Sequence, residues 1–199
     1  SVGTGVAAGI IHHGELYVGT NSSAGELGHI TVLPEGPPCA CGNRGCLQQL
    51  VAESAIAQRA RLALRSATGG ELHDAVGAHP EQLTADQVLR AADRGDETAG
   101  AVVREAAEYL AVGVATLVNL FNPQVVYLGG PVIEHSILLS ERVAEGVRRR
   151  AMAYPLSALS IRRSTLGADS SAVGASVLVL KHADTLLFAE TGREQASAR

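Results

Sequence analysis

The pattern of hydrophobic positions is clearest between residues 97 and 121, where it predicts a long helix. Apolar side chains recur there every three to four residues, the spacing of one face of an α-helix. This stripe consists of Val103, Ala106, Leu110, Val114, Leu117 and Phe121. The half that begins at Leu110 is apolar nearly all round, so we expect a helix that is buried on several sides. Asn122-Pro123 should end it, because proline cannot continue a helix.

Shorter helices are predicted on both sides of this segment. Ser54 is a candidate N-cap for a helix over residues 55–64. Thr84 or Asp86 should start another that ends near Gly95. Residues 66–82 between them show no clear period, so we expect an exposed excursion there.

Two further helices are predicted in the last third of the chain. Residues 137–152 are amphipathic, and residues 172 to about 187 form a final helix. Gly174 and Ala175 should allow that final helix to pack closely. We expect residues 188–199 to be a disordered tail.

Short apolar runs bounded by glycine and other turn residues predict the strands. The first pair, residues 6–11 and 15–18, reads as a hairpin with Gly14 in its turn. Later runs are expected at residues 30–33, 124–128 and 159–163, the second of them as a buried strand. Strands that alternate with helices in the second half of the chain indicate an α/β fold.

Composition limits the classes of protein that need to be considered. A chain of 199 residues with 46% hydrophobic residues suits one domain or one lobe of a larger protein. A formal net charge of −4 argues against a nucleic-acid surface spread over this chain. No apolar run reaches the length of a bilayer span, and no signal-peptide pattern is present, so we predict no membrane contact and a cytoplasmic location. The chain begins inside a glycine turn without methionine, so we expect the protein to continue upstream.

The stretch from residue 25 to residue 48 holds all three cysteines of the chain. Cys39, Cys41 and Cys46 follow His29, and three thiolates with one imidazole are the ligand set of a closed tetrahedral zinc site. The alternative is three buried free cysteines and an unrelated histidine. The prolines and glycines around the cysteines favour a loop over a packed core segment. The spacing therefore predicts a structural Zn²⁺ bound by His29, Cys39, Cys41 and Cys46.

Two glycine turns are candidates for contacts with a nucleotide. Gly3-Thr4-Gly5 could offer backbone N–H groups and a hydroxyl to a phosphate, although an ordinary tight turn explains it as well. Gly129-Gly130 follows the predicted strand at residues 124–128. The carboxyl end of such a strand is where α/β folds commonly bind ligands.

Taken in order, these motifs resemble the ROK family of bacterial sugar kinases and sugar-responsive repressors. The resemblance rests on Gly-Thr-Gly at 3–5, Glu-Leu-Gly-His at 26–29, Cys-Ala-Cys-Gly-Asn-Arg-Gly-Cys at 39–46, Leu-Gly-Gly at 128–130 and the helix with Gly174-Ala175. It implies an actin/hexokinase-like (ribonuclease H-like) fold, with residues 1–199 as the C-terminal lobe and the zinc-binding loop as an insertion. It also implies that Glu26 and His29 face a sugar cleft, with zinc on one ring nitrogen of His29. A loop with no ligand role for Glu26 stays the alternative.

The resemblance places the catalytic base and any DNA-binding head upstream, so no catalytic residue is predicted within this chain. Three positions depart from what the family's kinases usually carry: Ala7-Ala8 instead of further glycines, Gln48 instead of a sugar-binding glutamate, and Pro131 after the glycine pair. They favour the sugar-binding effector domain of a ROK transcriptional regulator, with Gln48 as a third sugar contact. The alternative is the C-terminal half of an ATP-dependent, glucokinase-like sugar kinase that uses Mg²⁺. The implied partners are a small-molecule sugar, further copies of the chain in a homodimer or higher homo-oligomer, and DNA through an upstream head.

Overall fold

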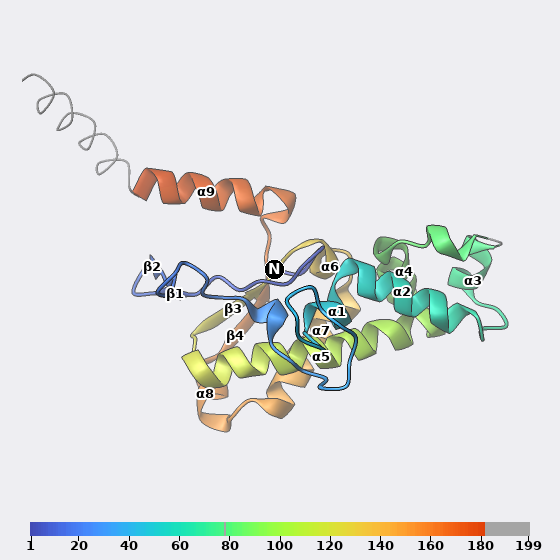
Figure 1. Cartoon of the computed structure of the whole chain (residues 1–199), viewed down its shortest axis with the longest axis horizontal. Helices are drawn as coiled ribbons and strands as arrows, with labels where there is room; N and C mark the ends of the chain where they lie inside the picture. Colours follow the sequence, from blue (N-terminus) through green and yellow to red (C-terminus); the bar gives the residue numbers. More distant parts are fainter. Residues whose placement is uncertain (78, 182–199) are drawn as a thin grey trace, which may run out of the picture. The chain divides into compact units, whose positions relative to one another are not determined.

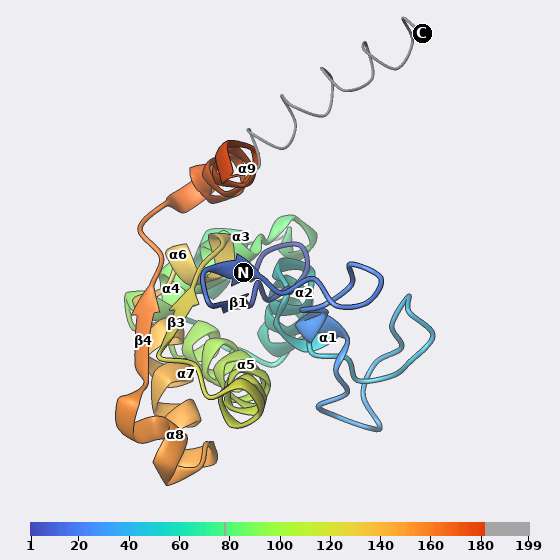
Figure 2. The same ribbon diagram turned by 90° about the vertical axis from the view of Figure 1, so that its left-hand side faces the viewer.

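In a computed structural model, which describes residues 1–77 and 79–181, the first unit of the chain (Ser1–Thr165) is built around the helix α5. It spans Glu97–Phe121, so the long helix predicted from the sequence is confirmed at both ends. The Asp96 side chain caps it by accepting a hydrogen bond of 2.8 Å from the Ala99 N–H. Asn122 ends it in the left-handed conformation, with φ of 46°. Helices α2, α4 and α7 pack against α5, which explains why its apolar surface is so wide (Figures 1 and 2).

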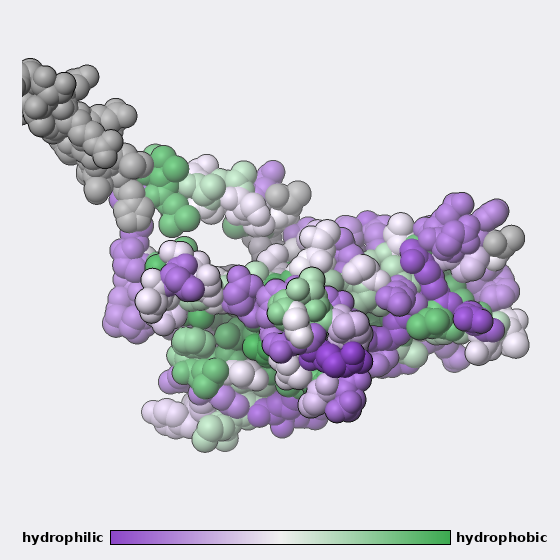
Figure 3. Space-filling view, viewed as in Figure 1, coloured by the Kyte–Doolittle hydropathy of each residue, from purple (hydrophilic) through white to green (hydrophobic). Residues whose placement is uncertain are grey.

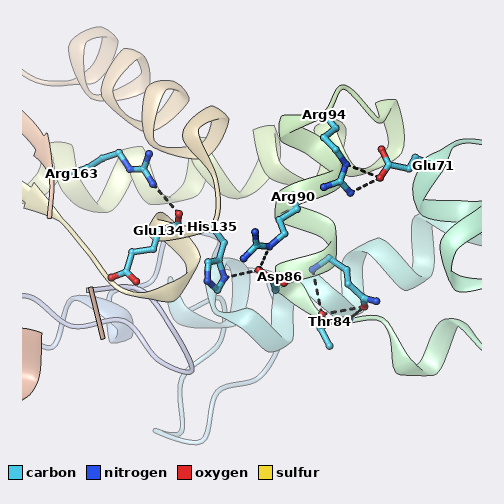
Figure 4. A network of polar contacts seen from close by, with 9 residues as sticks. Glu71, Thr84, Asp86, Arg90, Arg94, Glu134, His135 and Arg163 are labelled. Carbon is cyan, nitrogen blue, oxygen red and sulfur yellow. Dashed lines mark hydrogen bonds and ion pairs between the residues drawn. The ribbon is translucent and has the colours of Figure 1, made fainter. Parts of the chain in front are cut away.

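Helix α4 (Ala85–Asp93) begins at a capping box, which confirms Thr84 as the predicted start. The Thr84 hydroxyl accepts from the Gln87 N–H, and the Gln87 side chain accepts from the Thr84 N–H at 2.9 Å. On the outer side of the helix, Asp86 contacts both Arg90 and His135 (Figure 4). Helix α4 is therefore fixed at its start by local hydrogen bonds, and its apolar face packs on α5.

Residues 66–82 differ from the predicted exposed excursion. They contain α3 (Glu71–Val76) and the short 3₁₀ helix η2 (Pro80–Gln82). Leu72 of α3 is buried, and its backbone N–H donates to the Asp96 carboxylate at 2.9 Å. A helix of six residues is too short to show a period in the sequence. It depends instead on the buried Leu72 and on long-range contacts, since Arg94 also donates to the Glu71 carboxylate at 2.7 Å.

Helix α2 (Glu53–Leu64) starts earlier than predicted. Its N-cap is Ala52 and has no side-chain cap, so the prediction of Ser54 as the cap is wrong. The chain enters α2 directly from the one-turn helix α1 (Gln48–Val51). The buried side chains of α1 hold this junction, which leaves no need for a polar cap.

The N-terminus of α7 (Ile137–Arg150) is tied to the end of α4 by a carboxylate. Asp93 accepts hydrogen bonds from the Ser136 hydroxyl at 2.6 Å and from the backbone N–H groups of Ile137 and Leu138 at 2.7 and 3.1 Å. Ser136 caps the same helix through the Leu139 N–H. A negative charge at a helix N-terminus is stabilising, so this contact fixes α7 against the α4–α5 pair. The helix predicted over residues 137–152 is confirmed, two residues shorter.

Strands are few and short in the described residues. Strands β1 (Ile11–His12) and β2 (Glu15–Leu16) form an antiparallel hairpin, shorter than predicted. Strands β3 (Val125–Leu128) and β4 (Ser160–Arg163) pair in parallel, with Val125 opposite Ser160. The one-turn helix α6 (Pro131–Glu134) and α8 (Ala153–Ala158) lie on the connection between them, and Arg163 donates to the Glu134 carbonyl of α6 (Figure 4).

Two strand predictions are wrong. Residues 30–33 form no strand, because the backbone N–H groups of Val32 and Leu33 both donate to the carbonyl of Gly45 and bend the chain there. Strand β3 is not buried: Val125 is 36% exposed and Tyr127 59% exposed. Among the described residues β3 pairs with β4 alone, so its other edge borders a groove.

This apolar groove has a volume of about 510 Å³ and lies between residues 6–11 and β3. Its floor is the C-terminal half of α5, including Leu110, Val114 and Leu117. Figure 3 shows apolar surface gathered at the C-terminal end of α5, where Leu120 and Phe121 are exposed.

The second unit, from Leu166 onward, is described up to Lys181. It contains the 3₁₀ helix η3 (Gly167–Asp169) and α9 (Ser170–Lys181), which matches the start of the predicted last helix. Gly174 and Ala175 both lie within α9, and the close packing expected there stays a prediction. The predicted end near residue 187 and the predicted tail at 188–199 lie outside the described residues.

Helix length also bears on a membrane location. In the described part of the chain, no helix combines the length and apolar character needed to cross a bilayer.

Candidate metal and sugar site

The loop from residue 25 to residue 48 is held by backbone hydrogen bonds and turns instead of regular structure. The Cys39 N–H donates to the Asn43 carbonyl at 2.8 Å and the Gly42 N–H to the Cys39 carbonyl at 3.0 Å, which closes a tight turn around the first two cysteines. Gly45 has φ of 62°, and a Cβ there would lie 1.6 Å from the Leu33 carbonyl oxygen. Only glycine fits this position without moving the backbone.

The loop ends on the helical core. Leu47 is fully buried, and a Cβ added at Gly113 of α5 would lie 2.6 Å from its side chain. The absence of a side chain at Gly113 therefore lets the end of the loop approach α5 closely. From Leu47 the chain continues into α1, so the position of the loop is tied to the longest helix of the unit (Figure 2).

The structure brings the four predicted metal ligands together. One donor atom from each of His29, Cys39, Cys41 and Cys46 lies within 4.8 Å of all the others. The His29 Nδ1 is 3.6 Å from the Cys39 Sγ, and the Cys41 Sγ is 3.6 Å from the Cys46 Sγ. A tetrahedral zinc ion with Zn–S bonds of about 2.3 Å holds its ligand atoms about 3.8 Å apart. Both the donor set and the spacing fit a zinc ion.

The two buried cysteines differ in acidity. A hydrogen bond from the backbone N–H of Cys41 lowers the pKa of Cys39 to about 6, against the opposing effect of burial. Burial raises the pKa of Cys46 to about 12. Cys39 is therefore the more acidic of these two thiols. Metal uptake by such a set releases protons.

Glu26 and His29 lie on the outer side of the thiol cluster. The short 3₁₀ helix η1 (Leu27–His29) places the Glu26 Oε2 3.9 Å from the His29 Nε2, while the Nδ1 of the same ring faces Cys39. The Glu26 side chain is 64% exposed and that of His29 34%. The pair therefore offers a carboxylate acceptor and an imidazole N–H to a ligand from solvent.

Gln48 lies at the start of α1, next to the same cluster. Its Nε2 is 3.6 Å from the Cys39 Sγ, and its Oε1 is 3.1 Å from the position of a Cβ on Gly28. Gln49 also reaches the Cys39 sulfur, with its Nε2 at 3.6 Å. The sequence did not single out Gln49, because nothing in the residue order shows that two successive side chains turn toward one cysteine.

The two glycine turns predicted for a nucleotide also lie side by side. The Val2 N–H donates to the Gly129 carbonyl at 2.8 Å, and a Cβ on Gly3 would be 3.2 Å from the Pro131 ring. The Gly3 N–H donates within its own turn, to the carbonyl of Gly5 at 2.9 Å. The structure thus places the start of the first turn, at Val2 and Gly3, beside Gly129 and Pro131.

Two hollows in the described surface are lined by other residues. One is the apolar groove beside β3, and the other is an open polar hollow of about 650 Å³ lined by residues 66–71 and 94–98. Glu26, His29 and Gln48 form part of neither.

Comparisons with known proteins agree on one family. The family model described as "ROK family" matches residues 1–182. A glucokinase of Halalkalibacterium halodurans is 34% identical over 195 residues, which cover 98% of this chain and 58% of the relative. The DNA-binding transcriptional dual regulator NagC of Escherichia coli is 33% identical over 175 residues, 88% of this chain and 41% of the relative. The chain thus spans about half the length of these relatives.

A solved structure gives the same result for the fold. The crystal structure of a ROK family glucokinase from Streptomyces griseus, in complex with glucose and AMPPNP, superposes with a TM-score of 0.79 at 29% sequence identity. The match covers 89% of this chain and 58% of the other. The actin/hexokinase-like sugar kinase fold inferred from the sequence is therefore confirmed at the level of fold neighbours.

Proposed function

The chain belongs to the ROK family, and from this we propose that it is the sugar-binding effector lobe of a sugar-responsive transcriptional regulator. Residues 1–199 form the C-terminal lobe in this proposal, and the sugar cleft lies between this lobe and an upstream one. The relatives include a transcriptional regulator and a glucokinase, so family membership alone fits both activities.

The observation that supports a sugar ligand is the arrangement of Glu26 and His29. A zinc ion held by His29 Nδ1 and the three cysteines would fix the imidazole, and the free Nε2 would carry its N–H toward the ligand. The Glu26 carboxylate, 3.9 Å from that nitrogen, accepts from hydroxyl groups. A donor and an acceptor side by side match adjacent sugar hydroxyls, each of which both donates and accepts. The oxygen of the Gln48 amide adds a third contact in this proposal.

In this proposal zinc would have a structural role. His29 and the three cysteines would supply four ligands, which would leave no position for a catalytic water. When bound, the ion supplies a fixed point that holds the loop and orients His29. The residues of the chain provide all the contacts to the sugar.

Two contacts favour regulation over phosphoryl transfer. The Gln48 Nε2 is engaged with the Cys39 sulfur, which an ionised glutamate at this position could not do as a donor. Pro131 has no N–H, and its ring occupies the space beside Gly3, between the two glycine turns. Gln48 lacks the charge that a carboxylate would place beside the sugar, and Pro131 removes a backbone donor next to the glycine turns.

The mechanism that we propose for a regulator is a population shift. Sugar binding favours one arrangement of the two lobes and so changes the spacing of DNA-binding heads in a homodimer. The sugar must bind the two arrangements with different affinity for this to occur. The DNA-binding head lies upstream of these residues in the proposal, and the protein acts in the cytoplasm.

A second candidate is the C-terminal half of an ATP-dependent sugar kinase. The observation that favours it is the adjacency of Gly3-Thr4-Gly5 and Gly129-Gly130, joined by the hydrogen bond between Val2 and Gly129. Two neighbouring glycine turns suit the phosphates of ATP with Mg²⁺. The catalytic base would come from the upstream lobe.

The sugar site is tested by thermal shift of the full-length protein against a panel of hexoses and N-acetylhexosamines. We expect Glu26→Ala to abolish the stabilisation by the active sugar, because it removes the acceptor next to His29. Glu141→Ala, an exposed glutamate on α7, is the matched control and should keep the full shift. An unchanged shift in Glu26→Ala would remove Glu26 from the sugar site.

The two activities are separated by a coupled ATP assay of the full-length protein with the sugar that binds. A regulator shows sugar binding and sugar-dependent DNA binding without turnover. Robust sugar-dependent ADP release would overturn the regulator proposal in favour of the kinase.

A further inference from the structure

The sulfur of Cys39 lies within hydrogen-bonding distance of three side-chain nitrogens. The amide nitrogens of Gln48 and Gln49 each lie 3.6 Å from it, and the His29 Nδ1 lies at the same distance. The Cys41 and Cys46 sulfurs contact each other. Among the residues that the structure describes, neither of them receives a hydrogen bond from a side-chain amide.

From this we infer that Gln48 and Gln49 form an amide clamp, a pair of positioning residues that hold the Cys39 thiolate and set how tightly the loop retains its metal. This inference rests on the zinc site proposed above. It assigns a role to Gln49, which no sequence motif suggested, and a role in the metal loop to Gln48.

The chemistry of the thiolate supports the clamp. A thiolate sulfur that donates one lone pair to a metal keeps further lone pairs, which can accept hydrogen bonds from N–H groups. Hydrogen bonds to a charged acceptor are stronger than those to a neutral one. A set of three thiolates and a neutral imidazole on Zn²⁺ has a formal charge of −1, so donors near a sulfur offset excess negative charge. An amide oxygen turned toward the thiolate would be repelled, which fixes the nitrogens on that side.

The position of the two glutamines supports the clamp as well. They are the first two residues of α1, and successive positions on a helix point about 100° apart. Two long side chains are therefore needed for both to reach one sulfur from different directions. Both are half-buried, and Leu50 and Val51 of the same turn are buried, so the backbone that carries the amides is fixed in the core.

The clamp has a direct consequence for metal exchange. Cys39 is held from outside the metal shell, whereas Cys41 is exposed and has the other thiol as its neighbour. With a metal bound, Cys39 would be the ligand that side chains outside the metal site support, and Cys41 would be the most exposed ligand. Loss of an outer hydrogen bond to a ligand typically lowers metal affinity by about 10- to 100-fold.

The test compares metal release from the full-length protein loaded with Zn²⁺ or with Co²⁺. Gln49→Met keeps the length of the side chain without a donor, and Gln49→Glu replaces the donor by a charge. We expect Gln49→Met to weaken zinc binding about 10-fold against a competing chelator, and Gln49→Glu to weaken it further. Gln58→Met, at an exposed position on α2, is the matched control and should bind like the wild type.

The Co²⁺ form gives a readout that a general loss of stability does not change. Fewer N–H donors on a thiolate raise its electron density, so the sulfur-to-cobalt charge-transfer band should move to lower energy in Gln49→Met and not in Gln58→Met. Gln48→Met, which alters the other amide, should shift the band in the same direction. If both variants keep the wild-type band and release rate, the clamp is wrong while the metal site stands. If the wild type takes up neither metal, the zinc site and the clamp fail together.

Discussion

The helical core and the cysteine loop of the same unit are specified in different ways. The core consists of α5 and the helices packed on it, where buried apolar side chains recur at the helical period. The loop over residues 25–48 has two one-residue bridges and a short 3₁₀ turn, and its fold depends on glycine conformations and on four converging ligand atoms. The core therefore depends mainly on the burial of apolar side chains, whereas the loop requires its particular backbone and, in our proposal, its metal.

We therefore expect the helical core and the cysteine loop to respond to different substitutions. A cavity in the core should lower the free energy of unfolding and leave the ligands in place. A backbone clash in the loop should remove the metal site first. The following predictions run from the largest expected effect on unfolding to the smallest.

The largest effect is expected from a cavity under α5. Leu110 is 1% exposed at the centre of the helix, so Leu110→Ala should lower the free energy of unfolding by about 3 kcal/mol. Leu120→Ala, at a site 72% exposed on the same helix, should change it by less than about 0.5 kcal/mol. Urea unfolding followed by circular dichroism measures both. Equal effects of the two variants would contradict the view that burial on α5 holds the core.

A smaller loss of stability but a complete loss of metal is expected at Gly45. An added Cβ would lie 1.6 Å from the Leu33 carbonyl oxygen, so Gly45→Ala must shift the turn that carries Cys46. We expect about 2 kcal/mol of destabilisation and no bound zinc by metal analysis. Gly42→Ala is the matched control, because Gly42 also has a positive φ but has no atom within 4 Å of the added Cβ. It should cost about 1 kcal/mol and retain zinc. Zinc in Gly45→Ala at the wild-type level would show that the loop is not specified by this turn.

The smallest effect is expected at the surface of the core, from Glu108. Burial raises its pKa, but the guanidinium groups of Arg150 and Arg149 outweigh this and hold it below the ordinary value of 4.5. A carboxyl group with a lowered folded pKa stabilises the fold above its unfolded pKa, and that stability is lost as the pH falls through the folded value. The side chains of Glu108 and the two arginines are 34% to 54% exposed, so solvent screens the interaction and we expect less than about 1 kcal/mol. Glu108→Gln should flatten the loss of stability below pH 4.5, and an unchanged pH profile would contradict the contribution.

The same contrast explains what the sequence could predict of the fold. The bounds of α5 and the start of α4 follow from period and capping residues, because these signals are local. The strand expected at residues 30–33 does not form, because the Gly45 carbonyl, more than ten residues away in sequence, binds both of its N–H groups. The exposure of β3 likewise depends on which elements lie beside it, and no local pattern records that.

In the candidate site, too, some features follow from the local sequence and others depend on the fold. The spacing of the cysteines predicted the four residues that the structure brings together, because ligand type and loop residues are visible in the sequence. The contact of Gln49 with Cys39 depends on where α1 lies relative to the loop, and the buried Leu47 and Gly113 determine that position. The sequence also could not show that Pro131 packs against the turn at Gly3, because the two residues meet only in the folded chain.

The measurement that tests the central claim most directly is the metal content of the purified protein, combined with a count of reactive thiols. We predict one equivalent of zinc per chain, with Cys39, Cys41 and Cys46 protected from a thiol reagent until a chelator is added. Protein that contains no zinc, takes up none on reconstitution and shows three freely titrating thiols would contradict it.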